Sequence, residues 1–237
     1  LRSAVDPEGR YGVPIDSPVV SFKDTRLLKK QLRRYLGPLG VGVRCIDRAV
    51  EEGITAQRRM QQELQRQALM VMERAAKRNT VAVVVAGRPY HADPLINHGL
   101  PEILAGLGVD VIPESAVPIA PEETLQDSAV LTQWAYTNRI LAVAGTVARI
   151  PHLEMLQVTS FGCGLDAISA DEVREVLYNA GKTYTLIKMD EIANPGAVRI
   201  RLRSMLEAIR ERSEAGRPGR LPLRAARPLP GGPEKRT

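Results

Sequence analysis

The sequence has little cysteine and few aromatic residues: two cysteines, one tryptophan and two phenylalanines among 237 residues. Two thiols as far apart as Cys45 and Cys163 do not form the dense disulfide framework of a small secreted domain. We therefore expect a protein of the reducing cytoplasm. The two cysteines and three histidines also lack the spacing of a zinc site, which normally needs four ligands.

Long apolar runs and the familiar catalytic motifs are also missing. No stretch of about 18 apolar residues occurs, so we expect no membrane span and no membrane partner. The sequence contains no G-x-x-x-x-G-K-S/T, no G-x-G-x-x-G after its first predicted strand, and no C-x-x-C. It also contains no H-E-x-x-H and no G-x-S-x-G. These absences argue against a P-loop ATPase, a dinucleotide-binding domain, a zinc protease and a serine hydrolase.

The net charge of +6 is concentrated near the C-terminal end. Residues 199–237 hold eleven Lys or Arg and four Asp or Glu, so they carry +7 and residues 1–198 carry −1. The basic stretch has no Phe, Trp or Tyr on which bases could stack, so we expect no nucleic-acid partner. Residues 214–237, rich in Pro, Gly and Arg, are expected to form a disordered basic tail.

Residues 1–79 are expected to form an irregular and helical lead-in, which begins with turn-forming Pro, Gly and Asp. Asp24 can cap a helix that ends at Leu36. A longer helix is predicted over residues 46–78, because apolar residues recur there at steps near three and four. Cys45 precedes this helix among apolar residues and is expected to be structural.

Predicted strands alternate with predicted helices over residues 80–213. The first strand is predicted over residues 81–86, an apolar run rich in valine that is typical of a strand covered on both faces. Three more strands are predicted over residues 109–112, 153–158 and 183–189. Because every connection contains a predicted helix, the four strands should form one parallel sheet with right-handed crossovers. The predicted fold is a doubly wound, flavodoxin-like α/β domain with a four-stranded parallel sheet.

Short capping signals predict where the intervening helices start. Asp93 stands directly before a proline, the usual order of an N-cap and a first helical position. Asp127 or Ser128 is expected to cap the helix before the third strand. Ser169, with Glu172 three residues later, has the spacing of a capping box and predicts the start of the next helix.

The turn after the third predicted strand carries Cys163 between two glycines, in the sequence S-F-G-C-G-L-D of residues 160–166. In open α/β sheets, ligands bind at the carboxyl ends of the strands. An exposed thiol in such a turn suits a metal ligand or a reactive group. The other interpretation is a small buried thiol beside a tight turn.

A second polar loop, residues 87–99, follows the first predicted strand. An arginine here could bind a carboxylate or a phosphate, and the tyrosine and histidines could donate or relay protons. Because neighbouring parallel strands end at one edge, Arg88, Tyr90 or His91 should lie within about 10–12 Å of Cys163. The alternative is a purely local role in capping and turn formation. The candidate cofactor-binding residues are Arg88, Tyr90, His91, Asn97 and His98.

Both loops resemble a known family. Residues 87–99 and 160–167 are similar to the large CoA-substrate-specific enzyme activase-related proteins, which belong with the 2-hydroxyacyl-CoA dehydratases and benzoyl-CoA reductases. The resemblance extends over roughly residues 1–212 and includes residues 17–24, 184–191 and 199–204. The resemblance implies a dehydratase-like α/β component that holds a 4Fe–4S cluster and receives one electron from an ATP-hydrolysing activase.

By position, Cys163 matches a cluster cysteine of that family. Iron–sulfur clusters are held by thiolates gathered from separate loops, so Cys163 would be one metal ligand and the others would lie outside this chain. We accordingly expect a fragment of a longer protein that is not active alone. Two alternatives remain open. The chain could be a non-catalytic interaction domain that docks an activase module or partner subunit, or it could bind an anion or small molecule through Arg88 and helix N-termini.

Overall fold

The computed structural model describes residues 6–119, 134–160, 164–189 and 195–214. Contacts divide the chain into two compact units, Leu1–Gln62 and Glu63–Thr237. The candidate site lies entirely in the second unit. Within the described ranges, no helix is both long enough and apolar enough to cross a bilayer.

The first unit is helical. Its elements are the short helix α2 (Pro7–Tyr11), helix α3 (Thr25–Leu36), the 3-10 turn η1 (Gly37–Leu39) and the start of helix α4 (Val43–Arg78). Asp24 caps α3 as predicted, because its carboxylate accepts the N–H groups of Arg26 (2.8 Å) and Leu27 (3.2 Å). The buried side chains of this unit, which pack α3 against α4, are Leu28, Ile46 and Val50.

The expectation for Cys45 was wrong. Its side chain is exposed on the first turn of α4 rather than packed among apolar residues. Each residue of an α-helix is rotated by about 100° from the one before it, so sequence neighbours face different directions. Ile46 therefore points into the core while Cys45, one position earlier, faces solvent.

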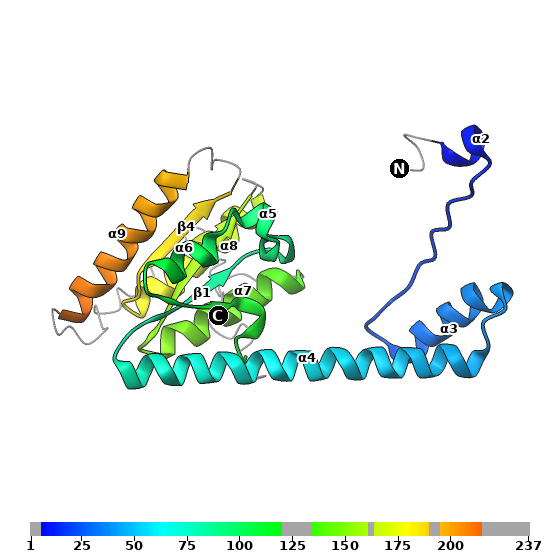
Figure 1. Cartoon of the computed structure of the whole chain (residues 1–237), viewed down its shortest axis with the longest axis horizontal. Coiled ribbons are helices and arrows are strands. Elements are labelled where there is room, and N and C mark those ends of the chain that lie inside the picture. Colours follow the sequence, from blue (N-terminus) through cyan, green and yellow to red (C-terminus); the bar gives the residue numbers. More distant parts are fainter. Residues whose placement is uncertain (1–5, 120–133, 161–163, 190–194, 215–237) are drawn as a thin grey trace, which may run out of the picture. The chain divides into compact units, whose positions relative to one another are not determined.

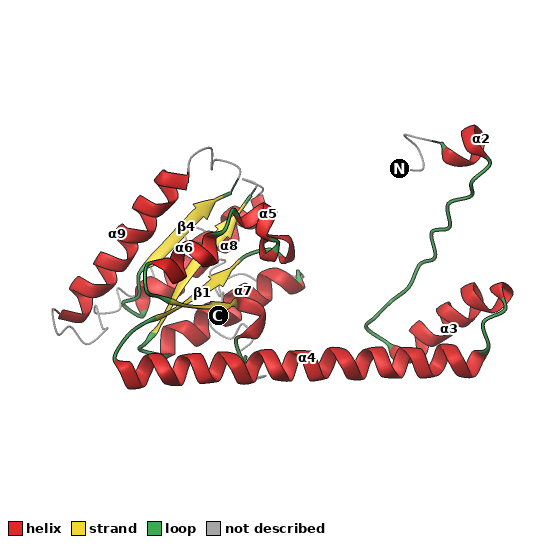
Figure 2. Ribbon diagram, in the orientation of Figure 1, coloured by secondary structure: helices red, strands yellow, loops and turns green. Residues whose placement is uncertain are grey.

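The second unit is built on a four-stranded sheet of β1 (Ala82–Ala86), β2 (Asp110–Pro113), β3 (Leu153–Thr159) and β4 (Tyr184–Lys188). Its strand order is β2-β1-β3-β4, and all three pairings are parallel. The sheet lies between helices, as Figures 1 and 2 show. The predicted α/β doubly wound class with a parallel sheet is therefore confirmed.

Helices cover both faces of the sheet. Helices α6 (Leu100–Gly106) and α9 (Pro195–Glu214) pack on one face. Helices α7 (Ala135–Arg149) and α8 (Gly164–Asn179) pack on the other, together with the C-terminal part of α4. The short helix α5 (Pro94–Asn97) and the 3-10 turns η2 (Pro89–Ala92) and η3 (Glu114–Ala116) lie in the loops that leave β1 and β2.

The strand residues alternate between the two cores. On β1, Ala82, Val84 and Ala86 belong to the core formed with α7 and α8, whereas Val83 belongs to the core formed with α6 and α9. All four are fully buried. This two-sided burial explains why the strand is apolar at every position. Ala68 and Ala75 of α4 also join the first of these cores, so the compact unit starts within α4, ahead of residue 80.

One expected helix start differs from the structure, and another lies outside the described residues. Helix α8 begins at Gly164, so the capping box predicted at Ser169 and Glu172 was wrong. Ser169 lies inside the helix and its hydroxyl donates to the carbonyl of Asp166 (3.1 Å), an ordinary use of serine within a helix. The other predicted caps, Asp127 and Ser128, lie outside the described residues.

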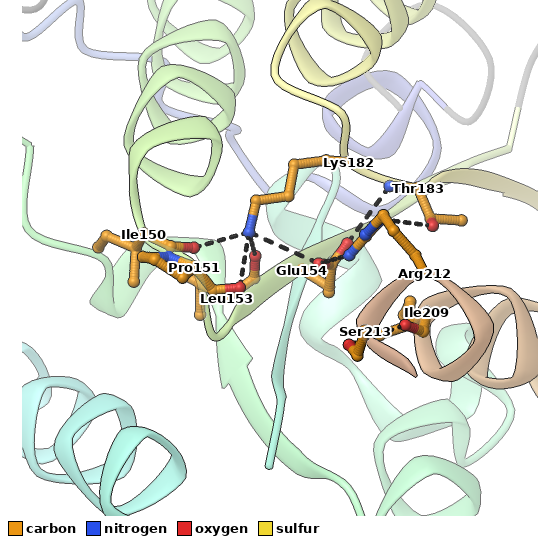
Figure 3. A network of polar contacts seen from close by, with 9 residues as sticks. All are labelled: Ile150, Pro151, Leu153, Glu154, Lys182, Thr183, Ile209, Arg212 and Ser213. Carbon is orange, nitrogen blue, oxygen red and sulfur yellow. Dashed lines mark hydrogen bonds and ion pairs between the residues drawn. The ribbon is translucent and has the colours of Figure 1, made fainter. Parts of the chain in front are cut away.

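A fully buried carboxylate joins β3 to α9 (Figure 3). Glu154, near the start of β3, is paired with Arg212 of α9, which also donates to the hydroxyl of Thr183 at 2.8 Å. The ammonium of Lys182 lies 3.5 Å from the same carboxylate. Two cations thus compensate one buried anion, which avoids the large cost of an unpaired buried charge.

Lys182 is held in turn by the backbone. Its ammonium donates to three carbonyl oxygens at 2.7–2.9 Å, and burial lowers its pKa while the charge of Glu154 opposes that shift. These carbonyls lie in the stretch from the end of α7 to the first residue of β3 (Figure 3). The network therefore ties the α9 end of the unit to the start of β3. The three carbonyls are those of Ile150, Pro151 and Leu153.

Replacing Arg212 by Ala should destabilise the second unit by roughly 3 kcal/mol, because the buried carboxylate of Glu154 loses its closest cation. The measurement is the free energy of unfolding from urea titration. Arg210→Ala is the matched control, since Arg210 lies on the exposed face of the same helix and pairs with the exposed Glu214. We expect a loss below about 1 kcal/mol for the control. Equal losses in both variants would contradict the role assigned to the network.

Candidate functional site

The candidate site lies at the carboxyl edge of the sheet, between β1 and β3. The chain leaves β1 toward β2 on one side and leaves β3 toward β4 on the other. Such a switch point is where open α/β sheets bind ligands. The loops that follow β1 and β3 therefore meet at one edge, as predicted. Cys163 itself lies outside the described residues, so its distance from Arg88 stays a prediction.

Arg88, on the β1 loop, forms an ion pair with Asp166 in the first turn of α8. Its guanidinium donates to one carboxylate oxygen through Nη2 (2.6 Å) and Nε (3.1 Å). The side chains are 27% and 12% exposed. A pair this sheltered from water interacts more strongly than a surface pair. It therefore connects the two loops directly.

His91 makes a second connection between the loops. Its Nε2 lies 2.8 Å from the hydroxyl of Ser160, the residue that follows β3. Its Nδ1 accepts the backbone N–H of Arg88 at 2.9 Å. Because Nδ1 accepts a hydrogen bond, it carries no proton, so the ring is neutral and Nε2 donates to Ser160. Burial lowers the pKa of His91; the charge of Asp166 raises it, and that of Arg88 lowers it further.

Gly87 allows His91 to approach the sheet. A Cβ atom at this position would lie 2.6 Å from Nδ1 of His91 and 2.6 Å from a methyl carbon of Val158. Both distances are far too short for real contacts. Position 87 is therefore limited to glycine for steric reasons, because any side chain here would overlap His91 and Val158.

The other three candidate residues have different positions. Asn97 is buried and supports the loop, since its amide donates to the carbonyl of His91 (3.1 Å) and accepts the N–H of Gly99 (3.0 Å). Tyr90 is 39% exposed and its ring centroid lies 4.4 Å from that of His91. His98 is exposed, ends α5 in the left-handed conformation and does not line the cleft described next.

A cleft of about 450 Å³ opens beside these residues at the ends of β1, β2 and β3. Arg88, His91 and Asn97 contribute to its lining. Its other polar residues were not recognised from the sequence. Glu114 and Ser115 follow β2 directly, a position at the same edge of the sheet that could have indicated them, and Tyr136 comes from the first turn of α7.

Glu114 is only 8% exposed, and burial raises the pKa of its carboxyl group. Arg139 of α7 opposes this shift from 3.9 Å, as do hydrogen bonds from Ser115. The same arginine donates to the backbone carbonyl of Glu114 at 2.7 Å, which fixes the turn after β2. Burial also raises the pKa of Tyr136, and the charge of Glu114 adds to that effect.

A complete metal site is absent from the described parts of the chain, where no three His, Cys, Asp or Glu side chains are grouped to hold an ion. The loops that follow β1 and β3 are connected by an ion pair and a hydrogen bond, and a small cleft lies beside them. The fastening residues Ser160 and Asp166 lie on either side of Cys163 in the sequence.

The neutral state of His91 should make folding depend on pH. Its pKa in the folded protein lies below the ordinary value of 6.5, so the unfolded chain binds the proton more readily. The contribution of the neutral His91 side chain to the free energy of unfolding is complete above pH 6.5, and it is lost as the pH falls toward the lowered pKa. His91→Gln should make the decline of unfolding free energy below pH 6.5 shallower, by at most about 1.4 kcal/mol per pH unit.

His98→Gln is the matched control for this titration, because His98 is exposed and does not line the cleft. Its pH profile, measured by urea unfolding between pH 5 and 8, should follow that of the unmodified chain. A His91→Gln profile that also follows the unmodified chain would show that the imidazole is not held neutral.

Comparison with known proteins gives one family match. Residues 1–117 match the family described as "CoA enzyme activase uncharacterised domain". The matched segment includes the first unit, the loop from Gly87 to His98 and Glu114, and it ends before the loop that carries Cys163. No curated protein and no solved structure matches the chain significantly. The match supports a relation to the CoA enzyme activase-related proteins.

Proposed function

We propose that this chain is a dehydratase-like α/β component of a CoA enzyme activase system, in which Cys163 supplies one thiolate ligand to a 4Fe–4S cluster. The observation that carries the proposal is that the residues on both sides of Cys163 in the sequence are held by contacts with the β1 loop. Arg88 holds Asp166 on one side of the cysteine, and His91 holds Ser160 on the other. The resemblance of both loops to the dehydratase group supports it.

The chain provides only part of the ligand set that such a cluster needs. A 4Fe–4S cluster usually takes four cysteine ligands, whereas the sequence has two cysteines. Cys45 lies in the first compact unit. The remaining ligands would come from other segments or subunits. When bound, the cluster supplies one-electron redox chemistry, and the electron donor in this proposal is an ATP-hydrolysing activase.

The residues of this chain would act by positioning. Ligands that are held in place by a surrounding shell of hydrogen bonds bind metals more tightly than loosely held ones. The sheltered Arg88–Asp166 pair and the His91–Ser160 hydrogen bond restrict both ends of the loop before any metal binds. Less conformational freedom is then lost when the cluster assembles.

Docking of an activase-type partner without a cluster is a second candidate function. It is favoured by the extent of the family match, which covers the whole first unit and ends before Cys163. A family defined on residues 1–117 does not require the thiol. The two functions differ in whether iron is bound.

Cys163→Ser should abolish iron binding in the intact protein purified without oxygen together with its activase-type partner, because a neutral hydroxyl does not replace a thiolate on iron. Iron content and visible absorption provide the measurement. Cys45→Ser is the control: it removes an exposed thiol of the first unit and should leave iron content unchanged. Both variants should unfold within about 0.5 kcal/mol of the unmodified chain. Undiminished iron in Cys163→Ser would exclude the ligand role, and a retained complex would then favour docking.

Asp166→Asn should release iron several-fold faster to a chelator, because Arg88 loses its charged partner and the loop is held less firmly. The comparison variant is Asp171→Asn on the same helix, where the carboxylate is 68% exposed and pairs with Arg174. We expect no change in the release rate for that variant. Identical release rates for the two would mean that the Arg88–Asp166 pair does not position the cysteine.

A further inference from the structure

We propose that the cleft at the carboxyl edge of the sheet binds a small neutral organic ligand, with an apolar body and an amide or hydroxyl head that hydrogen-bonds to Glu114 and Tyr136. This site is separate from the proposed cluster role, since it needs neither Cys163 nor iron. It follows from the lining, the charge balance and the hydrogen-bonding groups of the cleft.

The walls of the cleft are mostly apolar. Its volume of about 450 Å³ falls within the range of roughly 300–1,000 Å³ that is usual for small-molecule sites. Residues at the ends of β1, β2 and β3 line it, together with prolines from the adjoining loops. Such a surface favours an aliphatic or otherwise apolar body. The apolar lining residues are Val85, Pro89, Ala92, Pro101, Val111, Pro113 and Val158.

The charges around the cleft are already compensated. Arg88 directs two N–H groups to Asp166, and Arg139 faces the carboxyl group of Glu114. An anionic ligand would have to compete with Asp166 for Arg88 and would lie near Glu114. A cationic ligand would have to compete with Arg139. The pairing with Asp166 thus argues against the anion site for which the sequence suggested Arg88.

The hydrogen-bonding groups favour a head that both donates and accepts. Among the described residues, the hydroxyl of Tyr136 has no hydrogen-bond partner, and it can act as donor or acceptor. Glu114 is buried and lines the cleft, so its carboxyl oxygens can accept a hydrogen bond from a ligand. An amide or hydroxyl group complements both residues and brings no charge into the apolar cleft.

Three probes of nearly equal shape separate the alternatives: isobutyramide, isobutyrate and isobutylamine. They share the same branched apolar body and differ in the charge of the head group. Binding to the intact chain at pH 7.5 is measured by saturation-transfer NMR and by titration for the dissociation constant. We expect isobutyramide to bind at least about five-fold more tightly than either charged probe, a difference of about 1 kcal/mol.

Two variants locate the binding. Tyr136→Phe keeps the ring and removes the hydroxyl, so isobutyramide should bind about five-fold more weakly. Tyr178→Phe removes a hydroxyl from an exposed tyrosine of α8 and should have no effect. Glu114→Gln keeps an oxygen that accepts a hydrogen bond, so isobutyramide should still bind within about three-fold of the unmodified chain.

Other outcomes would overturn the proposal. Tighter binding of isobutyrate would make the cleft an anion site, and tighter binding of isobutylamine would make it a cation site at Glu114. Failure of all three probes to bind, or isobutyramide binding that Tyr136→Phe leaves unchanged, would exclude the proposed ligand class. None of these measurements depends on iron, so they test the ligand site independently of the proposed cluster role.

Discussion

The parallel pairing of β1 with β3 is the constraint on which the candidate site depends. It extends over five register pairs, from Ala82 opposite Leu153 to Ala86 opposite Gln157. Because both strands end at the same edge, the loops that follow them are brought together, although they are far apart in the sequence. The ion pair of Arg88 with Asp166 and the hydrogen bond of His91 with Ser160 are consequences of this pairing.

The two ends of the second unit use buried charge differently. At the start of β3, Glu154 is fully buried and is surrounded by Arg212 and Lys182, which makes a rigid structural connection. At the opposite edge, Glu114 is buried beside an open cleft and has its nearest cation, Arg139, 3.9 Å away. A carboxyl group with looser compensation in a concave site is more typical of ligand binding than of structural support.

Local patterns in the sequence were sufficient for the elements and for part of the site. A valine-rich run predicted β1, and Asp24 and Asp93 capped the helices as expected. Parallel strands place their following loops at one edge, so the meeting of the two loops could also be predicted. Of the candidate residues, Arg88 and His91 make the contacts between the loops, whereas His98 faces solvent, because α5 ends there in a left-handed turn.

Other features depended on contacts that no local pattern encodes. The exposure of Cys45 depends on how α4 is rotated against α3, and the role of Ser169 depends on where α8 begins. The charge balance of the cleft arises because Arg88 meets Asp166 and Arg139 meets Glu114 across the sheet edge. Periodicity and capping act over a few residues and therefore identify strands, helices and candidate loops. Strand order and helix packing bring distant residues within hydrogen-bonding distance. They therefore decide which charges are compensated and which hydroxyl faces a cavity.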